Sequence, residues 1–376
     1  MNLQHMKKVL LVTLDFYPSV GGVSYYWMKL AEQLTADRLV VVAPLLSTDT
    51  KELPVSYQII RKKFLSSWMQ PRWISLLMGL WSVLRKERPD VIVVGQILPV
   101  GTAVFLLSYV LHIPYIISCH GMDIIHQKSS RKRWLMKKIF GRACGTVGNS
   151  HYTSTAIQSF GVPSEKVSIV HPCPVRSPQE EKMILSDGQK SGHIILTVGR
   201  IVARKGHEYV IKSLSQVLKQ IPDIQYVILG DGPYRHELEM LVTRLGLQEH
   251  VQFLGALSDA EVRDWYTQAN VFIMTPVDLQ GDVEGFGIVY LEANAFGLPV
   301  IAAESGGVGE AVLDGKTGLV VSQKDVSAIS DAICSLLGSP SFAYTLGKQG
   351  KERIEREFQW KVQANGLVKA IEQYTL

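Results

Sequence analysis

Short apolar runs alternate with longer segments of helical periodicity along most of the chain. The runs are continuous stretches of Val, Ile and Leu, which is typical of strands covered on both faces of a parallel sheet. Such strands separated by helices predict a doubly wound α/β architecture. The expected strands are 8–14, 39–43, 91–94, 115–118, 146–148, 193–198, 224–229, 251–254, 271–274 and 299–302, and the expected helices include 24–34, 74–85, 207–219, 234–245 and 259–268.

The alternation lapses between residues 171 and 191, where three prolines accompany a charged stretch. Prolines clustered between periodic segments predict a loop, so we interpret this region as an interdomain linker. The length of 376 residues fits two domains, since a domain has about 100–200 residues. The sequence therefore predicts one domain over 1–175 and a second over 190–357.

One stretch imitates a membrane span, because residues 96–118 carry no Asp, Glu, Lys or Arg. Its length meets the criterion for a transmembrane helix. However, Pro99, Gly101 and Pro114 divide it, and Pro114 would break a continuous helix because it lacks an amide donor. We interpret the stretch as a buried helix over 100–112 followed by a buried strand.

Composition and charge narrow the functional classes. Hydrophobic residues make up 47% of the chain, which excludes intrinsic disorder. The four cysteines form no C-x-x-C pair, and the apolar run 9–14 is too short for a signal-peptide core, so a reducing cytosol is expected. Residues 1–180 hold 21 Lys and Arg against 10 Asp and Glu, and residues 181–376 hold 18 against 24. This asymmetry, +11 against −6, predicts an anionic surface that only the first half approaches.

Ligands of open α/β sheets bind at the carboxyl ends of the strands, so the loops there are the places to search. Gly21 and Gly22 lie between the first strand and the first helix. Paired glycines let the backbone approach a ligand, and the helix start offers free amides to a phosphate. The alternative is a tight turn that requires positive φ. The spacing is not that of the dinucleotide-binding G-x-G-x-x-G motif.

A second loop, 199–206, follows the strand at 193–198 and contains Arg200, Arg204 and Lys205. Arg offers a planar fork of donors and Lys a compact charge, and together they suit a diphosphate. A solvated charge run is the alternative, but such runs are usual on exposed helices rather than at strand ends. The loop therefore predicts phosphate binding.

The most informative pattern is a pair of carboxylates eight residues apart. Glu284 lies in a Gly-rich turn, and Glu292 follows a little over two turns into an apolar helix. Carboxylates accept hydrogen bonds from vicinal hydroxyls, and each such bond contributes about 1.5–3 kcal/mol. The alternative is that Glu284 stabilises the helix dipole and Glu292 is solvated. The Gly-rich turn before so apolar a helix favours a sugar-binding pocket.

With these motifs the chain resembles retaining glycosyltransferases of family 4, which have the GT-B fold, two Rossmann-like domains facing a cleft. It is most similar to bacterial phosphatidylinositol mannosyltransferase-like hexosyltransferases. The resemblance covers nearly the whole chain, and the E-x7-E spacing combined with the cationic loop is its specific part. Further matching segments are Gly21-Gly22, His120-Gly121, Asn149-Ser150, Gly230–Pro233, Ser305–Glu310 and Gly318.

The resemblance implies a role for each matching residue. Arg200 and Lys205 would neutralise the donor diphosphate, and the amide of Gly22 would hold the same phosphates from the other domain. The remaining donor contacts that it implies are Gly21, Gly199, Gly255, Phe286, Gly287 and Ile288.

The sugar contacts follow in the same way. Glu284 would bond hydroxyls of the donor sugar, and Glu292 would bond those of the ribose. His120 would lie against the sugar near the reacting carbon. A core histidine with satisfied hydrogen bonds is the alternative for His120.

The expected mechanism follows from charge. Negative charge grows on the leaving diphosphate in the transition state, so the site needs fixed cations there. Because the E-x7-E pair is assigned to hydroxyl binding, the family expectation is same-face attack with the leaving phosphate as base. A D-x-D metal clamp is not apparent, since Asp278 and Asp282 are too far apart. Metal-independent transfer without a resident cofactor is therefore predicted, with the nucleotide sugar as co-substrate.

Two basic segments predict contact with an anionic membrane. Residues 128–142 hold seven cations beside Trp134, and residues 64–88 mix Trp with Arg and Lys. Each cation near anionic lipid contributes about 1 kcal/mol. The alternative is an exposed basic helix beside a core helix. Nucleic acid is not favoured as a partner, because no nucleic-acid-binding motif accompanies the charge.

We therefore expect a cytoplasmic enzyme, peripheral to the inner face of the cell membrane. It would move a hexose from a nucleotide sugar to a lipid-linked or glycan acceptor, with GDP-mannose the first donor and a UDP-hexose the second. The alternatives are a sugar-nucleotide epimerase on the same fold, which needs no acceptor, and a non-enzymatic two-lobed sugar-binding protein. By the same resemblance, the helix at 358–376 should pack back on the first domain.

Overall fold

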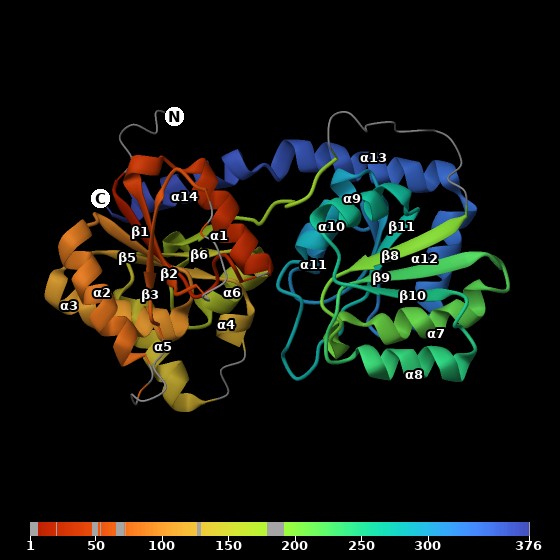
Figure 1. Cartoon of the computed structure of the whole chain (residues 1–376), viewed down its shortest axis with the longest axis horizontal. Coiled ribbons are helices and arrows are strands. Elements are labelled where there is room, and N and C mark those ends of the chain that lie inside the picture. The colour runs from red at the N-terminus through yellow and green to blue at the C-terminus, as the bar shows by residue number, and fades with distance from the viewer. Residues whose placement is uncertain are drawn as a thin grey trace. The chain divides into compact units, whose positions relative to one another are not determined.

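The structure is a computed structural model that describes residues 7–19, 21–46, 52, 54–64, 71, 73–125, 129–178 and 192–375. It divides into two compact units (Figure 1). Unit 1 comprises Met1–Pro172 and Trp360–Leu376, and unit 2 comprises Cys173–Gln359. The last helix of the chain therefore belongs to unit 1, although the residues before it belong to unit 2.

Unit 1 is built on a seven-stranded sheet in which every neighbouring pair is parallel. The strand order β3-β2-β1-β4-β5-β6-β7 reverses beside β1, as it does in a doubly wound sheet. The strands are β1 (Val9–Val12), β2 (Leu39–Pro44), β3 (Gln58–Lys62), β4 (Val91–Val94), β5 (Tyr115–Cys119), β6 (Gly145–Gly148) and β7 (Val167–Ile169).

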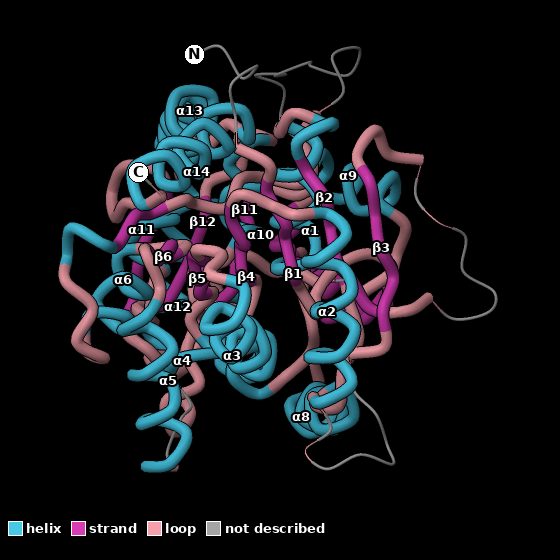
Figure 2. Tube along the Cα trace, turned by 90° about the vertical axis from the view of Figure 1, so that its left-hand side faces the viewer, coloured by secondary structure: helices cyan, strands magenta, loops and turns pink. Residues whose placement is uncertain are grey.

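Helices cover both faces of this sheet. They are α1 (Gly22–Gln33), α2 (Ile74–Glu87), α3 (Thr102–Leu111), α4 (Met122–Ile125), α5 (Ser130–Arg142), α6 (His151–Gln158) and α14 (Trp360–Tyr374). In Figure 2, α14 lies above the strands and α3 and α5 lie below them. Val9 and Leu11 of β1 join the core that contains α1 and α14, whereas Leu10 and Val12 join the core that contains α2, α3 and α5. Successive side chains of a strand point to opposite faces, so a strand covered on both sides is apolar at every position.

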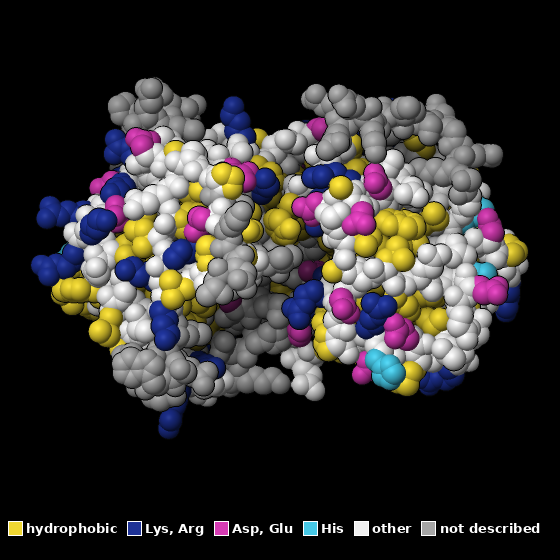
Figure 3. Space-filling model, viewed as in Figure 1, with side chains coloured by type: hydrophobic (Ala, Val, Ile, Leu, Met, Phe, Trp, Pro, Cys, Tyr) yellow, Lys and Arg dark blue, Asp and Glu magenta, His cyan; other side chains and the backbone are white. Residues whose placement is uncertain are grey.

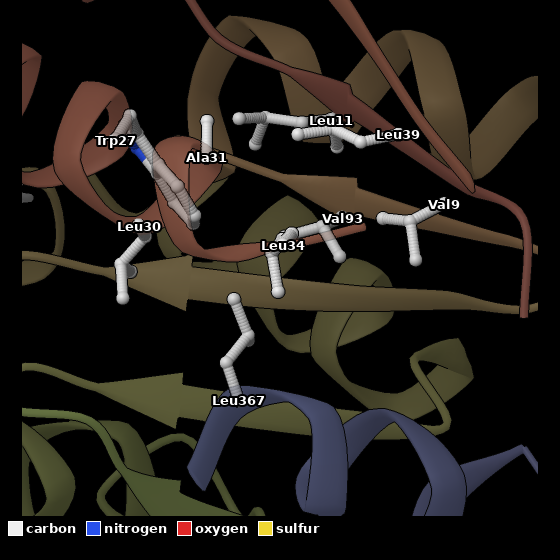
Figure 4. Close-up of a pocket in the computed structure, with 9 residues that line it drawn as sticks. All are labelled: Val9, Leu11, Trp27, Leu30, Ala31, Leu34, Leu39, Val93 and Leu367. Carbon is white, nitrogen blue, oxygen red and sulfur yellow. The ribbon is translucent and has the colours of Figure 1, made fainter. Parts of the chain in front are cut away.

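Helix α14 brings the end of the chain onto the sheet of unit 1. Leu367 points from α14 toward the strand residue Val93 and toward Leu34, which follows the end of α1, beside a small apolar cavity (Figure 4). At the end of the helix, the ring of Tyr374 lies against Gly145 of β6, where a Cβ atom would come within 2.0 Å of the ring. The Tyr374 hydroxyl also hydrogen-bonds Ser168 at 2.8 Å. The helix is thus part of the core of unit 1.

Unit 2 is built on a six-stranded parallel sheet in the order β10-β9-β8-β11-β12-β13. Its strands are β8 (His193–Val198), β9 (Ile224–Leu229), β10 (Val251–Gly255), β11 (Val271–Met274), β12 (Val300–Ala303) and β13 (Gly318–Val321). Its helices are α7 (His207–Val217), α8 (Arg235–Leu245), α9 (Asp259–Gln268), α10 (Ile288–Ala295), α11 (Val308–Ala311), α12 (Val326–Gly338) and α13 (Pro340–Glu357).

The two faces of the unit 2 sheet have different partners. Val271 and Ile273 of β11 belong to the core that contains α7, α8 and α12. Phe272 between them packs on Tyr266 of α9 and Tyr290 of α10, with ring centroids 6.0 and 5.9 Å away. Helices α9 and α10, which carry site residues, are therefore fixed to the same face of the sheet.

The predicted doubly wound α/β class is confirmed, and every predicted strand is present. The sequence analysis missed three strands, β3, β7 and β13. All three lie at the edge of a sheet and are partly exposed. Polar residues interrupt β3 and β7, so these two lack the continuous apolar run that marks a central strand. Edge position alone did not hide a strand, because β10 also lies at an edge and was predicted.

The apolar stretch 96–118 contains a π-helical turn (Ile97–Gly101), α3 and β5. The prediction of a buried helix is only partly right, because Leu106, Tyr109 and Val110 of α3 are 41–60% exposed. In the described part of the chain, no single helix combines the length and apolarity that a membrane span needs, and the bent pair α12 and α13 meets both criteria only when joined.

We predict that Leu367→Ala destabilises unit 1 by about 2–5 kcal/mol, because it opens a cavity under α14. Hydrogen exchange should become faster in peptides of unit 1 and stay unchanged in unit 2. The control is Val362→Ala on the same helix, where the side chain is 52% exposed and the expected change is within about 0.5 kcal/mol. Equal effects of the two variants, or faster exchange in unit 2, would contradict the packing of α14 described above.

Candidate active site

The cationic loop after β8 is held close to the end of β11. It forms a short turn at Ala203–Lys205 and passes through Gly206 into α7. Gly206 has φ 74°, and a Cβ atom on it would lie 1.7 Å from the carbonyl oxygen of Thr275. Only glycine permits this approach, which fixes the position of the preceding cations.

Two of these cations converge on one buried carboxylate. Lys205 Nζ lies 2.6 Å and Arg204 Nη1 lies 2.8 Å from Glu284 Oε2. Arg204 also places Nε 3.2 Å from Asp282. Burial alone would raise the pKa of Glu284, but Lys205 and Arg204 outweigh it and hold that pKa below its usual value. Glu284 is therefore ionised at neutral pH.

The backbone of Glu284 is clamped by the turn that begins α11. Its amide donates to Ser305 Oγ at 3.2 Å, and its carbonyl accepts from the amide of Gly307 at 2.9 Å. Gly306 lies so close that a Cβ atom on it would be 2.2 Å from the Glu284 carbonyl oxygen. Ser305 in turn donates to Asp278 at 2.5 Å. A hollow of about 530 Å³ opens beside this clamp and is lined by residues 304–320.

Helix α10 starts directly after the Gly-rich turn. Gly287 caps it with φ 87°, and a Cβ atom there would lie 2.4 Å from the ring of Tyr290. Ile288 is the first helical residue, and Phe286 is buried. The first amides of a helix lack partners within the helix, so this turn offers donors to a ligand.

The second carboxylate, Glu292, is 1% exposed. Arg176 Nη1 donates to both of its oxygens, at 3.2 and 3.1 Å, and the Tyr266 hydroxyl donates to Oε2 at 3.0 Å. Burial raises the pKa of Glu292, and Arg176 opposes this rise. The alternative of a solvated Glu292 is therefore wrong.

Three glycines meet where β8, β9 and β10 end. The amide of Gly230 donates to the carbonyl of Gly255 at 2.7 Å, and a Cβ atom on Gly230 would lie 2.0 Å from the carbonyl oxygen of Gly199. Gly199 precedes Arg200, whose side chain is exposed. Arg200 is thus exposed, whereas Lys205 is half-buried in its ion pair with Glu284.

In unit 1, Gly21 caps α1 and Gly22 is the first helical residue. The φ of Gly21 is 166°, which is extended backbone, so the alternative of a turn with positive φ does not hold at this residue. His120 follows β5 and is half-buried, with the rings of Tyr26 and Trp27 edge-on at 5.0 and 5.7 Å. Burial lowers the pKa of His120 to about 4, so its imidazole is neutral at pH 7.

Other polar side chains gather at the strand ends of unit 1. Gln96, after β4, donates to Asp15 Oδ2 at 2.7 Å and to Thr13 Oγ1 at 3.0 Å. Asp123 accepts from the backbone amide of His120 at 3.0 Å. Burial raises the pKa of Asp123 to about 6, although backbone hydrogen bonds lower it in part, and the charge of Asp15 adds to the rise.

Sequence reasoning assigned no role to Arg176, Tyr266, Gln96 or Asp123. Gln96 and Asp123 carry a signal that was available, because each follows a predicted strand. Arg176 carried no such signal, because it lies in a proline-rich stretch and only the tertiary structure brings it to its partners. Arg204 was recognised as a loop cation, but its contact with Glu284 was not foreseen.

Solved structures place this architecture in a known class. The chain superimposes on the Anabaena protein HepE in complex with UDP and glucose with a TM-score of 0.79, 19% sequence identity, and 98% and 100% of the two chains covered. A sucrose-phosphate synthase from Thermosynechococcus elongatus gives 0.79 and 23%, with 97% and 98% covered. The fold, with its two doubly wound parallel sheets, is that of a GT-B glycosyltransferase.

Sequence relatives define the family. The model "Glycosyltransferase Family 4" matches residues 20–173, and "Glycosyl transferases group 1" matches residues 180–353. A GDP-mannose-dependent alpha-(1-6)-phosphatidylinositol monomannoside mannosyltransferase of Mycolicibacterium smegmatis is 30% identical, with 96% of this chain and 98% of the relative covered. A monoacylated-substrate counterpart from Corynebacterium glutamicum is 29% identical, with 97% and 98% covered. The chain belongs to glycosyltransferase family 4.

We predict that Glu284→Gln lowers stability at pH 7 by about 3–5 kcal/mol, because it leaves two half-buried cations without their carboxylate. The pKa of Glu284 is depressed below 4.5 in the folded chain. The ion pairs therefore stabilise the fold above that pH and are lost as the pH falls through the folded pKa. Thermal unfolding midpoints of the wild type and the variant should converge as the pH is lowered from 7 to 3.

The matched control is Glu355→Gln, which replaces an exposed carboxylate of α13. Its unfolding midpoint should follow that of the wild type at every pH. A Glu284→Gln variant that keeps a constant offset from the wild type down to pH 3 would show that the ion pairs contribute nothing.

Proposed function

We propose that the chain is a retaining hexosyltransferase that transfers mannose from GDP-mannose to a phosphatidylinositol-type lipid acceptor. The relatives with this activity in their names cover nearly the full length of both chains, which supports the donor and the acceptor class. The observation that carries the proposal is the buried contact of Lys205 and Arg204 with Glu284. It brings phosphate-binding cations and a hydroxyl-binding carboxylate to one point.

In the proposed donor site, the role of each group follows from its charge. Both cations contact Oε2 of Glu284, so Oε1 is the oxygen that we assign to a sugar hydroxyl. Lys205 and the exposed Arg200 would stabilise the charge that grows on the leaving diphosphate, and such preorganised electrostatics is usually the largest catalytic contribution. Glu292 would accept the ribose hydroxyls. The neutral imidazole of His120 would hydrogen-bond a hydroxyl of the transferred sugar.

The proposed stereochemistry follows from the state of Glu284. A carboxylate with a depressed pKa that two cations neutralise is a poor nucleophile, so a covalent glycosyl-enzyme through Glu284 is not favoured. We assign same-face attack, with the leaving phosphate as the base. We also propose that no metal ion takes part, because Arg200 and Lys205 supply the positive charge at the diphosphate. The two aspartates that precede Glu284 in this loop are engaged, Asp282 with Arg204 and Asp278 with Ser305.

The proposed membrane surface is formed by α2, α3 and α5 of unit 1. Met136, Ile139 and Phe140 of α5 are buried in the core, so its cations face outward. Figure 3 shows several Lys and Arg side chains, in dark blue, on the unit 1 side. The neighbouring helices add exposed apolar side chains, namely Met78, Trp81, Leu106, Tyr109 and Val110. Lys128, Trp68 and Arg72, which belong to the predicted segments, lie outside the described residues.

Cations beside exposed apolar side chains are the composition of a surface that lies on an anionic membrane. Trp134 is 62% exposed, and Lys138 lies 5.7 Å from its ring centroid. Arg142 lies 3.9 Å from the ring of Tyr109, which joins α5 to α3. We therefore propose that this surface holds the enzyme at the membrane that contains its acceptor.

The activity test uses purified protein, GDP-mannose or UDP-glucose, and a phosphatidylinositol mannoside acceptor in buffer with EDTA. We expect transfer from GDP-mannose with an α-linked product, which corresponds to retention of the donor configuration. Donor turnover without an acceptor would favour an epimerase. The absence of transfer from both donors across several lipid and glycan acceptors would overturn the proposal.

Two variants test the cations in this assay. Lys205→Gln and Arg200→Gln should each lower kcat about 100–1000-fold, because each removes charge from the leaving diphosphate. Arg200 is exposed, so its replacement should leave the unfolding midpoint unchanged. The control is Lys212→Gln on α7, where the side chain is 41% exposed and pairs with Glu208. If Lys205→Gln and Arg200→Gln lose no more activity than Lys212→Gln, the assignment of the two cations to the diphosphate is refuted.

The membrane surface is tested by flotation with phosphatidylglycerol-containing vesicles. Replacing Arg131, Lys132 and Lys137 by Gln should weaken binding on the order of 100-fold, since each cation contributes about 1 kcal/mol. The control neutralises three exposed cations of unit 2, Arg244, Lys316 and Lys348. Equal weakening by the two triple variants would show that α5 has no special role.

A further inference from the structure

Arg176 is a half-buried arginine that the donor-site roles above do not use. It lies just after the chain enters unit 2 at Cys173, and its side chain is 15% exposed. Its Nη1 donates to both oxygens of Glu292 at 3.2 and 3.1 Å, and the backbone of Val175 also hydrogen-bonds Glu292. The segment that opens unit 2 therefore contacts the second carboxylate of the E-x7-E pair directly.

The other end of the guanidinium is held as well. Nε and Nη2 donate to Oδ1 of Asp259 at 2.9 and 2.7 Å. Asp259 is the first residue of α9, and that helix starts with a capping box between Ser258 and Glu261. Because the guanidinium is planar, bonds at both ends fix its orientation. Arg176 is thus directed at Glu292 by a helix terminus whose own geometry is fixed.

Glu292 needs such a partner. A carboxylate that is 1% exposed is strongly disfavoured in its charged form unless it is paired and hydrogen-bonded. The described titratable groups that face Glu292 are Arg176 and Tyr266, with Asp259 behind the guanidinium. Arg176 is the cation of this set, and Tyr266 supplies a neutral donor. Burial raises the pKa of Glu292, and Arg176 is the main influence that lowers it.

We propose that Arg176 is a positioning residue for the nucleotide: it holds Glu292 ionised and in one rotamer, so that a carboxylate oxygen is presented to the vicinal hydroxyls of the ribose. This inference rests on the proposed function, in which Glu292 accepts the ribose hydroxyls. Among the side-chain donors, Oε2 receives both Arg176 and Tyr266, whereas Oε1 receives Arg176 alone. We therefore assign the ribose contact to Oε1.

The first experiment measures GDP binding by calorimetry between pH 5 and pH 9. In Arg176→Met, the pH at which affinity reaches half its maximum should move upward by about 1–3 units, because an opposite charge at this distance lowers a carboxylate pKa by that amount. Arg176→Lys should reverse part of this shift toward the wild-type value, since it returns the charge without the planar fork. In Arg176→Met with Glu292→Gln, the shifted pH dependence should disappear.

The second experiment needs no ligand. Without Arg176 the folded-state pKa of Glu292 rises further above its unfolded value, so stability is lost as the pH rises from 5 to 8. The unfolding midpoint of Arg176→Met should fall over that range relative to the double variant. The control, Arg353→Met, removes another half-buried arginine, which pairs with a Glu357 that is 41% exposed. Its midpoint should show no such pH-dependent fall.

The outcomes separate the inference from the proposed function. Wild-type protein that binds neither GDP nor UDP overturns the proposed function and the ribose contact, and the unfolding data then decide the coupling of Arg176 to Glu292 alone. Nucleotide binding by the wild type with an unshifted profile in Arg176→Met overturns the inference and leaves the proposed function intact. A shift of the same size in the double variant would mean that Arg176 acts through something other than Glu292.

Discussion

A carboxylate buried between a lysine and an arginine is the interaction on which the unit 2 site depends. Glu284 has little access to water, so its charge persists because Lys205 and Arg204 lie within 2.8 Å of one of its oxygens. Each charge is stabilised by the opposite charge beside it, because an unpaired ion at this site carries a large desolvation free energy. The contact joins the loop after β8 to the turn before α10, and with them the two halves of the proposed donor site.

Close backbone approaches are what make this ion pair possible. Gly206 lies against the carbonyl of Thr275, and Gly306 lies against the carbonyl of Glu284. A Cβ atom would come within 1.7 Å of the Thr275 oxygen or 2.2 Å of the Glu284 oxygen, so a side chain at either position would force the segments apart and lengthen the ion pair. The glycines therefore act through the backbone. They let neighbouring segments approach closely, and this approach brings the charged side chains within ion-pair distance.

The sequence allowed a good prediction of the central strands, since a strand covered on both faces is apolar throughout and is recognised without knowledge of its neighbours. It also placed Lys205 and Glu284 in loops and turns at strand ends, where the topology of a parallel sheet gathers them, and Glu292 in the helix that follows Glu284. The edge strands β3, β7 and β13 were missed, and in β3 and β7 polar residues interrupt the apolar pattern. In unit 1, α3 was predicted to be a buried helix, although three of its apolar side chains are exposed.

Local chemistry and periodicity are properties of the chain, so the sequence by itself determined the alternation of strands and helices, the glycine turns and the supply of cations and carboxylates. Which charge meets which was decided only by the tertiary structure. Arg204, rather than Arg200, pairs with Glu284, and Arg176 reaches Glu292 across 116 positions of sequence. Ion pairing depends on distances of a few ångströms between side chains from different elements, and no pattern along the chain records those distances.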